Sequence, residues 1–279
     1  MCELIKIRQI LKKCKIQVVA KSMQWKQVEE NWVLTPAKPK GVIHFLGGAF
    51  FAAAPHVTYG RVLEQLAENN YAIVATPFLN NTFDHCQIAR DVHASFRKAR
   101  SKLFLDYFPV FGMGHSMGCK IHLLMNCLYN PTRAGNIFIA YNNYSADRSI
   151  PFFKELASKI PEMSSMNFIP SPKETEQMVA ANYQTTHNLL IKFVDDGIDE
   201  ISILDLLLKQ KFPKTVTLQT LEGTHMTSMG LDMKWQTGSS FSAIDAIAQW
   251  VKQEMHKNNQ SLELVLLAWL AKQASLPLA

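Results

Sequence analysis

The apolar residues of this chain fall into two alternating patterns. Short apolar runs rich in β-forming residues alternate with longer stretches in which apolar side chains recur every three or four positions. Strands alternating with helices through short connections predict an α/β fold with a mostly parallel, doubly wound sheet. The runs that predict strands are 31–34, 41–46, 71–77, 109–113, 136–140, 189–194 and 215–221. The stretches that predict helices are 57–69, 88–104, 119–129, 173–183, 203–209 and 242–256.

One strand–helix junction carries the pattern Gly-His-Ser-Met-Gly at residues 114–118. A G-x-S-x-G sequence between a strand and a helix is typical of a nucleophile elbow, a sharp turn that exposes the serine hydroxyl. Gly114 and Gly118 would lack side chains because strand and helix approach closely there. Ser116 is therefore the candidate nucleophile, and the N–H of Met117, at the start of the helix, would face an oxyanion formed on it.

A serine hydroxyl needs a base near neutral pH, and the base needs an orienting carboxylate. In the α/β-hydrolase arrangement these partners follow the serine in the order acid, then histidine. His225 follows the last predicted strand through a Gly-Thr-His turn, which makes it the candidate base. Asp196 is the first candidate for the acid because it lies just beyond the strand at 189–194, with Asp195 second and Asp199 third. The carboxyl ends of parallel strands share one edge of the sheet, where ligands bind.

The oxyanion hole needs a second N–H donor besides that of Met117. A double glycine follows the strand at 41–46, where esterases carry an HGGG-type loop, although the leading His44 is displaced. The expected donors are Gly48, Ala49 and Phe50, the last two favoured, and Phe50 and Phe51 would add an apolar wall. An ordinary turn is the alternative.

Residues 143–187 interrupt the alternation of strands and helices with a loop-rich stretch of methionine, phenylalanine and proline. An apolar insertion above the carboxyl edge of a sheet predicts a small lid or cap over an acyl pocket. The alternative is that these side chains pack on the domain. The expected lining consists of Phe51, Phe152, Phe153, Met163, Met166 and Phe168.

With 279 residues and 48% hydrophobic content, the chain fits one α/β domain, expected at 23–258, better than two. Residues 1–22 hold six basic residues against one acidic, which is five of the six net positive charges. They form a basic extension, read either as an organelle-targeting presequence or as the product of an upstream start codon before Met23. The rest is close to neutral, which argues against nucleic acid. Residues 259–279 are expected as a C-terminal amphipathic tail, a candidate for peripheral contact with a membrane surface or with a partner.

The five cysteines are scattered, without a C-x-x-C pair, and predict reduced thiols in an intracellular compartment. We expect no metal and no organic cofactor. No apolar run reaches the length of a membrane span. These features together favour a cytoplasmic protein.

Five stretches carry a resemblance to a known family: Asn31-Trp-Val-Leu, His44-Phe-Leu-Gly-Gly-Ala-Phe, Tyr71-Ala-Ile-Val-Ala-Thr-Pro-Phe, Thr82-Phe-Asp-His and Gly114-His-Ser-Met-Gly-Cys-Lys. With them the chain is similar to the α/β-hydrolase superfamily over about 41–256, and more narrowly to a cyanobacterial and plant family filed as a domain of unknown function, DUF1350. The resemblance implies a serine-hydrolase site without a known substrate. It also implies a photosynthetic source, so a plastid location or a peripheral position on a thylakoid or other internal membrane is the alternative.

The leading hypothesis is a serine esterase, lipase or thioesterase that cleaves a small-molecule acyl ester or thioester through Ser116, His225 and Asp196. The apolar insertion motivates the preference for a medium or long acyl chain. The alternatives are a non-catalytic binding or scaffold protein on a hydrolase fold, and an acyltransferase to an acceptor other than water.

Overall fold

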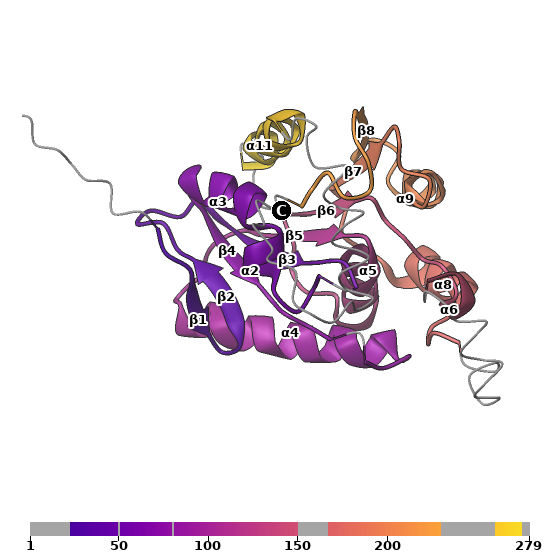
Figure 1. Ribbon diagram of the computed structural model, residues 1–279, viewed down its shortest axis with the longest axis horizontal. Coiled ribbons are helices and arrows are strands. Elements are labelled where there is room, and N and C mark those ends of the chain that lie inside the picture. Colours follow the sequence, from indigo (N-terminus) through magenta and orange to yellow (C-terminus); the bar gives the residue numbers. More distant parts are fainter. Residues whose placement is uncertain (1–22, 50, 80, 150–166, 230–259, 275–279) are drawn as a thin grey trace, which may run out of the picture.

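The computed structural model describes residues 23–49, 51–79, 81–149, 167–229 and 260–274, which form one sheet covered by helices (Figure 1). The sheet has eight strands in the order β1-β2-β4-β3-β5-β6-β7-β8. Six of them, from β3 onward, run parallel to one another. The strands are β1 (Lys26–Val28), β2 (Asn31–Leu34), β3 (Gly41–Leu46), β4 (Tyr71–Ala75), β5 (Val110–His115), β6 (Gly135–Ile139), β7 (Asn188–Phe193) and β8 (Val216–Leu221).

The two strands at one edge depart from the parallel pattern. β2 pairs antiparallel with β4, and β1 pairs antiparallel with β2. β1 is missing from the sequence prediction because it has only three residues, of which Lys26 and Gln27 are exposed and polar. The predicted mostly parallel α/β sheet is otherwise confirmed.

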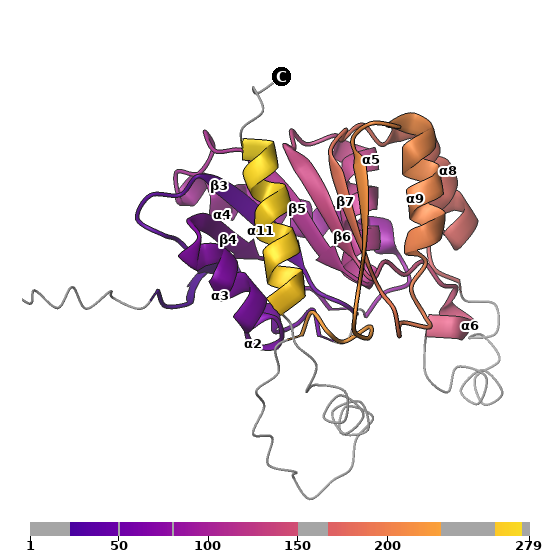
Figure 2. The ribbon, with the colours of Figure 1, turned by 90° about the horizontal axis from the view of Figure 1, so that it is seen from above.

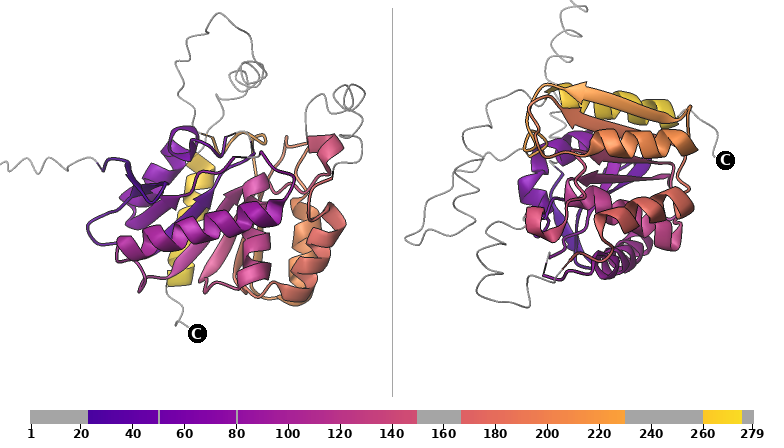
Figure 3. Two further views of the ribbon diagram at one scale, coloured as in Figure 1. Left: turned by 90° about the horizontal axis from the view of Figure 1, so that it is seen from below. Right: turned by 90° about the vertical axis from the view of Figure 1, so that its right-hand side faces the viewer.

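Helices cover both faces of the sheet (Figures 2 and 3). One face is covered by α3 and α11, and the other by α4, α5, α8 and α9. Alternate residues of the central strands point to opposite faces, so both faces are apolar. The helices are α2 (Pro55–Thr58), α3 (Gly60–Glu68), α4 (His85–Lys102), α5 (Met117–Tyr129), α6 (Ala146–Ser149), α8 (Pro172–Asn182), α9 (Ile201–Lys211) and α11 (Gln260–Ala274). The helix predicted at 242–256 and the basic extension at 1–22 lie outside the described residues.

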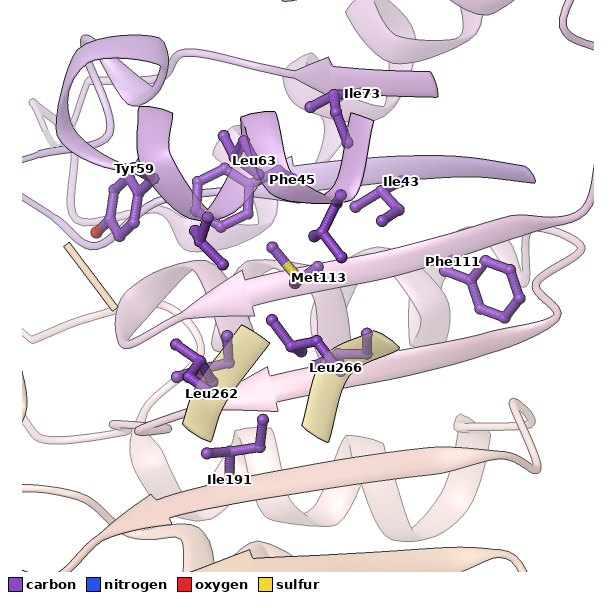
Figure 4. Packing of buried hydrophobic residues seen from close by; sticks show 14 of the residues in the cluster. Ile43, Phe45, Tyr59, Leu63, Ile73, Phe111, Met113, Ile191, Leu262 and Leu266 are labelled. Carbon is purple, nitrogen blue, oxygen red and sulfur yellow. The ribbon is translucent and has the colours of Figure 1, made fainter. Parts of the chain in front are cut away.

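The C-terminal helix α11 is part of the core and does not stand apart as a tail. Its residues Leu262, Leu266 and Leu270 are buried in the same cluster as the strand residues of one sheet face. Figure 4 shows Leu262 and Leu266 beside Met113 and Ile191. The apolar face that suggested contact with a membrane or partner is thus buried against the domain itself.

The helix predicted at 57–69 is divided at Tyr59, whose φ and ψ of −117° and 12° interrupt the helical backbone between α2 and α3. Pro55 starts α2, where its fixed φ is tolerated. The interruption turns the fully buried Tyr59 side chain toward the serine turn, where its hydroxyl contacts His115.

Part of the stretch 143–187, expected as a lid, is the helix α8, which connects the parallel strands β6 and β7. Its Val179, and Tyr183 just after it, are buried in one cluster with side chains of α5 and α9. Ser171 and Glu174 form a capping box at its start. The stretch before Pro172 holds the short α6 and, at 150–166, residues outside the described part.

Candidate active site

Ser116 lies on a strained turn between β5 and α5. Its φ of 53° and ψ of −121° fall outside the regions that non-glycine residues normally occupy. A Cβ on Gly114 would lie 2.6 Å from the Cys119 nitrogen, and one on Gly118 would lie 2.6 Å from the Gly47 oxygen. Both glycines are therefore dictated by backbone contacts, as the motif predicts, and the turn lifts Ser116 to the carboxyl edge of the sheet.

Asp196 and His225 follow β7 and β8 and meet Ser116 at this edge. The Nδ1 atom of His225 lies 2.7 Å from Oδ2 of Asp196, and its Nε2 lies 3.0 Å from Oγ of Ser116. The other carboxylate oxygen of Asp196 accepts the N–H groups of Ile198 and Asp199. Because a carboxylate only accepts, Nδ1 of His225 carries the proton and Nε2 is left to accept from the serine hydroxyl.

The surroundings keep Asp196 ionised. Burial raises the pKa of this carboxyl, but the hydrogen bond and charge of His225 and the N–H of Ile198 outweigh burial and lower it below the ordinary 3.8. The side chain is fully buried, so the anion is held by directed hydrogen bonds. A carboxylate in this state can orient His225 and stabilise its positive charge.

The other two aspartates have different surroundings. Asp195 is exposed to solvent. Asp199 accepts the N–H of Ile201 and lies 3.6 Å from the Lys192 ammonium group. Of the three candidates for the acid, Asp196 is the one hydrogen-bonded to His225.

The loop after β3 supplies fewer free donors than expected. The N–H of Gly48 donates to the Tyr59 hydroxyl at 2.9 Å, so Gly48 is removed from the expected set of oxyanion donors. Ala49 borders the same cavity as Ser116, and Phe50 lies outside the described residues. The N–H of Met117 is the first of α5, and a helix provides no internal acceptor for it.

His115 connects the serine turn to the His225 loop and, through Tyr59, to the loop after β3. The sequence did not reveal this role, because the pattern G-x-S-x-G allows any residue at its second position. Its Nε2 lies 2.8 Å from the backbone oxygen of His225, and its Nδ1 lies 2.9 Å from the Tyr59 hydroxyl. Because the backbone carbonyl of His225 only accepts, Nε2 of His115 carries the proton. Nδ1 of His115 therefore accepts a hydrogen bond from the Tyr59 hydroxyl, and the oxygen of that hydroxyl accepts one from the N–H of Gly48. Burial is the main cause that lowers the pKa of His115 to about 3, which keeps the ring neutral.

Ser116 borders a cavity of about 330 Å³, at the lower end of the range typical of ligand pockets. Phe51 and Phe168, which the sequence places in an acyl pocket, line this cavity. Phe152, Phe153, Met163 and Met166 lie outside the described residues. The rest of the wall is mixed: Ile198 and Met226 are apolar, whereas His85, Lys120, Asn142, Asn143 and Arg148 are polar.

Two further properties of the described residues concern the requirements of a metal site and of a membrane-spanning helix. Within them, no group of three histidine, cysteine, aspartate or glutamate side chains is arranged to hold a metal ion. Among the helices they form, none combines the length and apolar character that crossing a bilayer requires.

The sheet order and the strained serine turn before α5 define the class: the protein has an α/β-hydrolase fold. Three solved structures show the likeness. The peroxisomal α/β-hydrolase Lpx1 of Saccharomyces cerevisiae is 14% identical over 92% of this chain and 89% of its own, with a TM-score of 0.56. The Pyrococcus furiosus esterase Pf2001 is 13% identical over 83% and 89%, with a TM-score of 0.55. A thermostable carboxyl esterase of Bacillus coagulans is 11% identical over 90% and 98%, with a TM-score of 0.52.

The chain belongs to the family described as "Protein of unknown function (DUF1350)", which matches residues 24–272. This confirms the resemblance seen in the sequence. No curated protein matches the chain. At identities of 11–14%, the structural likeness establishes the fold but not the activity, which depends on the residues of the site.

Proposed function

We propose that this protein is a serine hydrolase of the esterase, lipase or thioesterase type, acting on the ester or thioester of an acyl chain. The observation that carries the proposal is the continuous line of hydrogen bonds from Asp196 through His225 to Ser116 beside a cavity. The hydrogen bonds suit the chemistry: the Asp196 carboxylate accepts from Nδ1 of His225, and Nε2 of His225 faces the serine hydroxyl.

In the proposed reaction, Oγ of Ser116 attacks the carbonyl carbon of the substrate while Nε2 of His225 takes the hydroxyl proton. The carbonyl electron pair moves onto the oxygen, which the N–H groups of Met117 and Ala49 stabilise. When the tetrahedral intermediate collapses, the bond to the alcohol or thiol breaks and the leaving group receives the proton from His225. Water then attacks the acyl-enzyme in the same way and releases the carboxylic acid.

Asp196 contributes through His225. Its carboxylate fixes the ring so that Nε2 faces Ser116, and it stabilises the imidazolium that forms during the attack. Its two N–H contacts from Ile198 and Asp199 hold the carboxylate in place.

The cavity supports an acyl substrate. Phe51, Phe168, Ile198 and Met226 offer an apolar wall on which a hydrocarbon chain would lose contact with water. Two of the proteins with a similar fold are named as esterases, and this analogy supports the proposal of ester hydrolysis.

Labelling with a fluorophosphonate probe tests the proposal, because such probes react with activated serines. The wild type should be labelled, whereas Ser116→Ala and His225→Ala should not. Ser101→Ala, on the exposed end of α4, is the matched control and should be labelled like the wild type. Hydrolysis of p-nitrophenyl esters and acyl-thioesters should follow the same order.

The absence of labelling in the wild type, repeated with detergent or lipid present, would contradict the proposal and favour a binding protein on a hydrolase fold. Labelling without ester or thioester hydrolysis would instead point to transfer of the acyl group to an acceptor other than water.

A further inference from the structure

The cavity at Ser116 contains a second polar centre that the proposed hydrolysis does not use. Lys120 and His85 both line this cavity, and both are 98% buried. Lys120 lies in the first turn of α5, which begins directly after Ser116. Its Nζ lies 5.7 Å from the centre of the Phe168 ring, and the His85 ring lies 4.3 Å from that same centre.

Lys120 is a buried cation, and most of its N–H donors have no acceptor among the described residues. The ammonium group has three donors, and within the described residues it makes one hydrogen bond, to the backbone oxygen of Pro170 at 3.1 Å. The nearby carboxylates are used elsewhere: Glu174 accepts from Ser171, and Glu200 accepts the N–H of Asn143. Among the residues that the structure describes, none forms a salt bridge with Lys120. Because burying an unpaired charge costs free energy, an anion that entered the cavity would be stabilised here.

His85 supplies a complementary donor. Both of its ring nitrogens are buried and have no hydrogen-bond partner in the described part of the chain. Burial is the main cause that lowers its pKa to about 3, and the charge of Lys120 lowers it further, so the ring is neutral. A neutral imidazole carries one N–H, which could donate to an oxygen of a ligand.

The rim of the cavity carries a further positive charge. Arg148, at the end of the short α6, lines the cavity, and its guanidinium group stacks 3.7 Å from the centre of the Tyr144 ring. It lies in an exposed position, where its charge would attract an anion toward the cavity.

We propose that Lys120 and His85 form an anion-binding subsite, so that the substrate is an acyl ester or thioester that also carries a carboxylate or phosphate group. The proposal rests on the proposed function of Ser116 and narrows its substrate class. The ammonium group of Lys120 would pair with the anion, the N–H of His85 would donate to a second oxygen, and Phe168 would pack against the intervening hydrocarbon.

A purely structural role for Lys120, as an anchor for the loop at Pro170, makes a different prediction. Such an anchor would influence charged and neutral substrates alike. Lys120→Gln keeps a donor for the Pro170 carbonyl and removes the charge, so it separates the two roles. Lys98→Gln, on the exposed side of α4, is the matched control for the loss of one positive charge.

The kinetic test uses p-nitrophenyl monoesters of dicarboxylic acids beside p-nitrophenyl esters of monocarboxylic acids of matched length. The wild type should prefer the charged esters at one chain length, which reports the spacing between Ser116 and the subsite. In Lys120→Gln, the ratio of kcat/KM for charged over neutral esters should fall about tenfold or more, because a charge-assisted contact is lost. Lys98→Gln should keep the wild-type ratio. An unchanged ratio in Lys120→Gln would overturn the proposal.

A binding test does not depend on turnover. Calorimetric titration of Ser116→Ala protein with an alkyl carboxylate, an alkyl phosphate and the alcohol of equal length should show about tenfold tighter binding of at least one anion. The better anion distinguishes carboxylate from phosphate, and a second substitution, Lys120→Gln, should abolish the preference. If wild-type protein hydrolyses nothing but this preference is found, the subsite stands and the hydrolase proposal fails. Equal binding of alcohol and anions would overturn the subsite.

Discussion

The Nε2 atom of His115 lies 2.8 Å from the backbone carbonyl oxygen of His225, so the residue before the candidate nucleophile holds the loop of the candidate base. The two imidazole rings are 4.9 Å apart. Since His115 also accepts a hydrogen bond from Tyr59, which binds the N–H of Gly48, one buried network joins the serine turn, the histidine loop and the loop after β3. We therefore assign His115 the role of a positioning residue, which acts by holding these three loops together.

Replacing His115 tests this relationship. His115→Leu should lower kcat/KM about tenfold, the kinetic equivalent of losing one hydrogen bond of about 1.4 kcal/mol. His115→Gln, whose amide N–H could reach the same carbonyl, should recover part of the loss. Esterase kinetics and thermal unfolding of both variants are the measurements. If both variants lose stability equally and keep equal kcat/KM, the histidine has a structural role only.

Asp196 and Asp195 are adjacent carboxylates with opposite surroundings, which allows a matched comparison. Asp196→Asn should reduce kcat by about 10³–10⁴-fold, because the amide would favour the wrong tautomer of His225. Asp195→Asn should leave kcat close to the wild-type value, since Asp195 is exposed beside the site. Measuring kcat for the steady-state hydrolysis of one p-nitrophenyl ester by the two variants tests which carboxylate is the acid. Similar losses in both would refute the assignment of the acid.

Gly118 and Gly197 differ in the space around their α-carbons. A Cβ on Gly118 would lie 2.6 Å from the Gly47 oxygen, whereas one on Gly197 would meet nothing within 4 Å. Gly118→Ala should therefore destabilise the protein by at least about 2 kcal/mol, because the backbone of the loop must shift. Gly197→Ala should change the free energy of unfolding by no more than about 0.5 kcal/mol. Urea denaturation of both variants provides the comparison.

Four buried histidines and the partly buried His93 predict a loss of stability in mild acid. Burial is the main cause that lowers the pKa of each from the ordinary 6.5: to about 4 for His93, to about 3 for His85 and His115, and well below 6.5 for His44 and His122. Below pH 6.5 the unfolded chain binds protons that the folded protein does not yet bind, so unfolding is favoured as the pH falls. The free energy of unfolding should be largest above pH 6.5 and decrease toward pH 5.

Urea denaturation between pH 7.5 and pH 5 measures this effect. Each histidine that stays neutral in the folded state contributes a slope that approaches about 1.4 kcal/mol per pH unit below pH 6.5. A stability that is constant across the window would mean that these rings take up protons without unfolding.

The local sequence determined the secondary structure and the serine turn, because both depend on residues close together in the chain. The apolar periodicity located the central strands and most helices, and the glycines around Ser116 marked the strained turn, because backbone contacts within a few residues require them. Chain order also singled out His225, since a base after the last strand must return to the same sheet edge.

Tertiary structure decided what depends on residues far apart in the chain. The sequence ranked Asp196 ahead of Asp195 and Asp199 without excluding either. The hydrogen bond between Asp196 and His225 forms only where the ends of β7 and β8 lie side by side, which the local sequence does not specify. The joining of Gly48, Tyr59 and His115, and the meeting of Lys120 with His85 in one cavity, arise because parallel strands and their helices converge at one edge. The burial of α11 has the same origin, since an apolar helix face finds its partner only when the sheet is assembled.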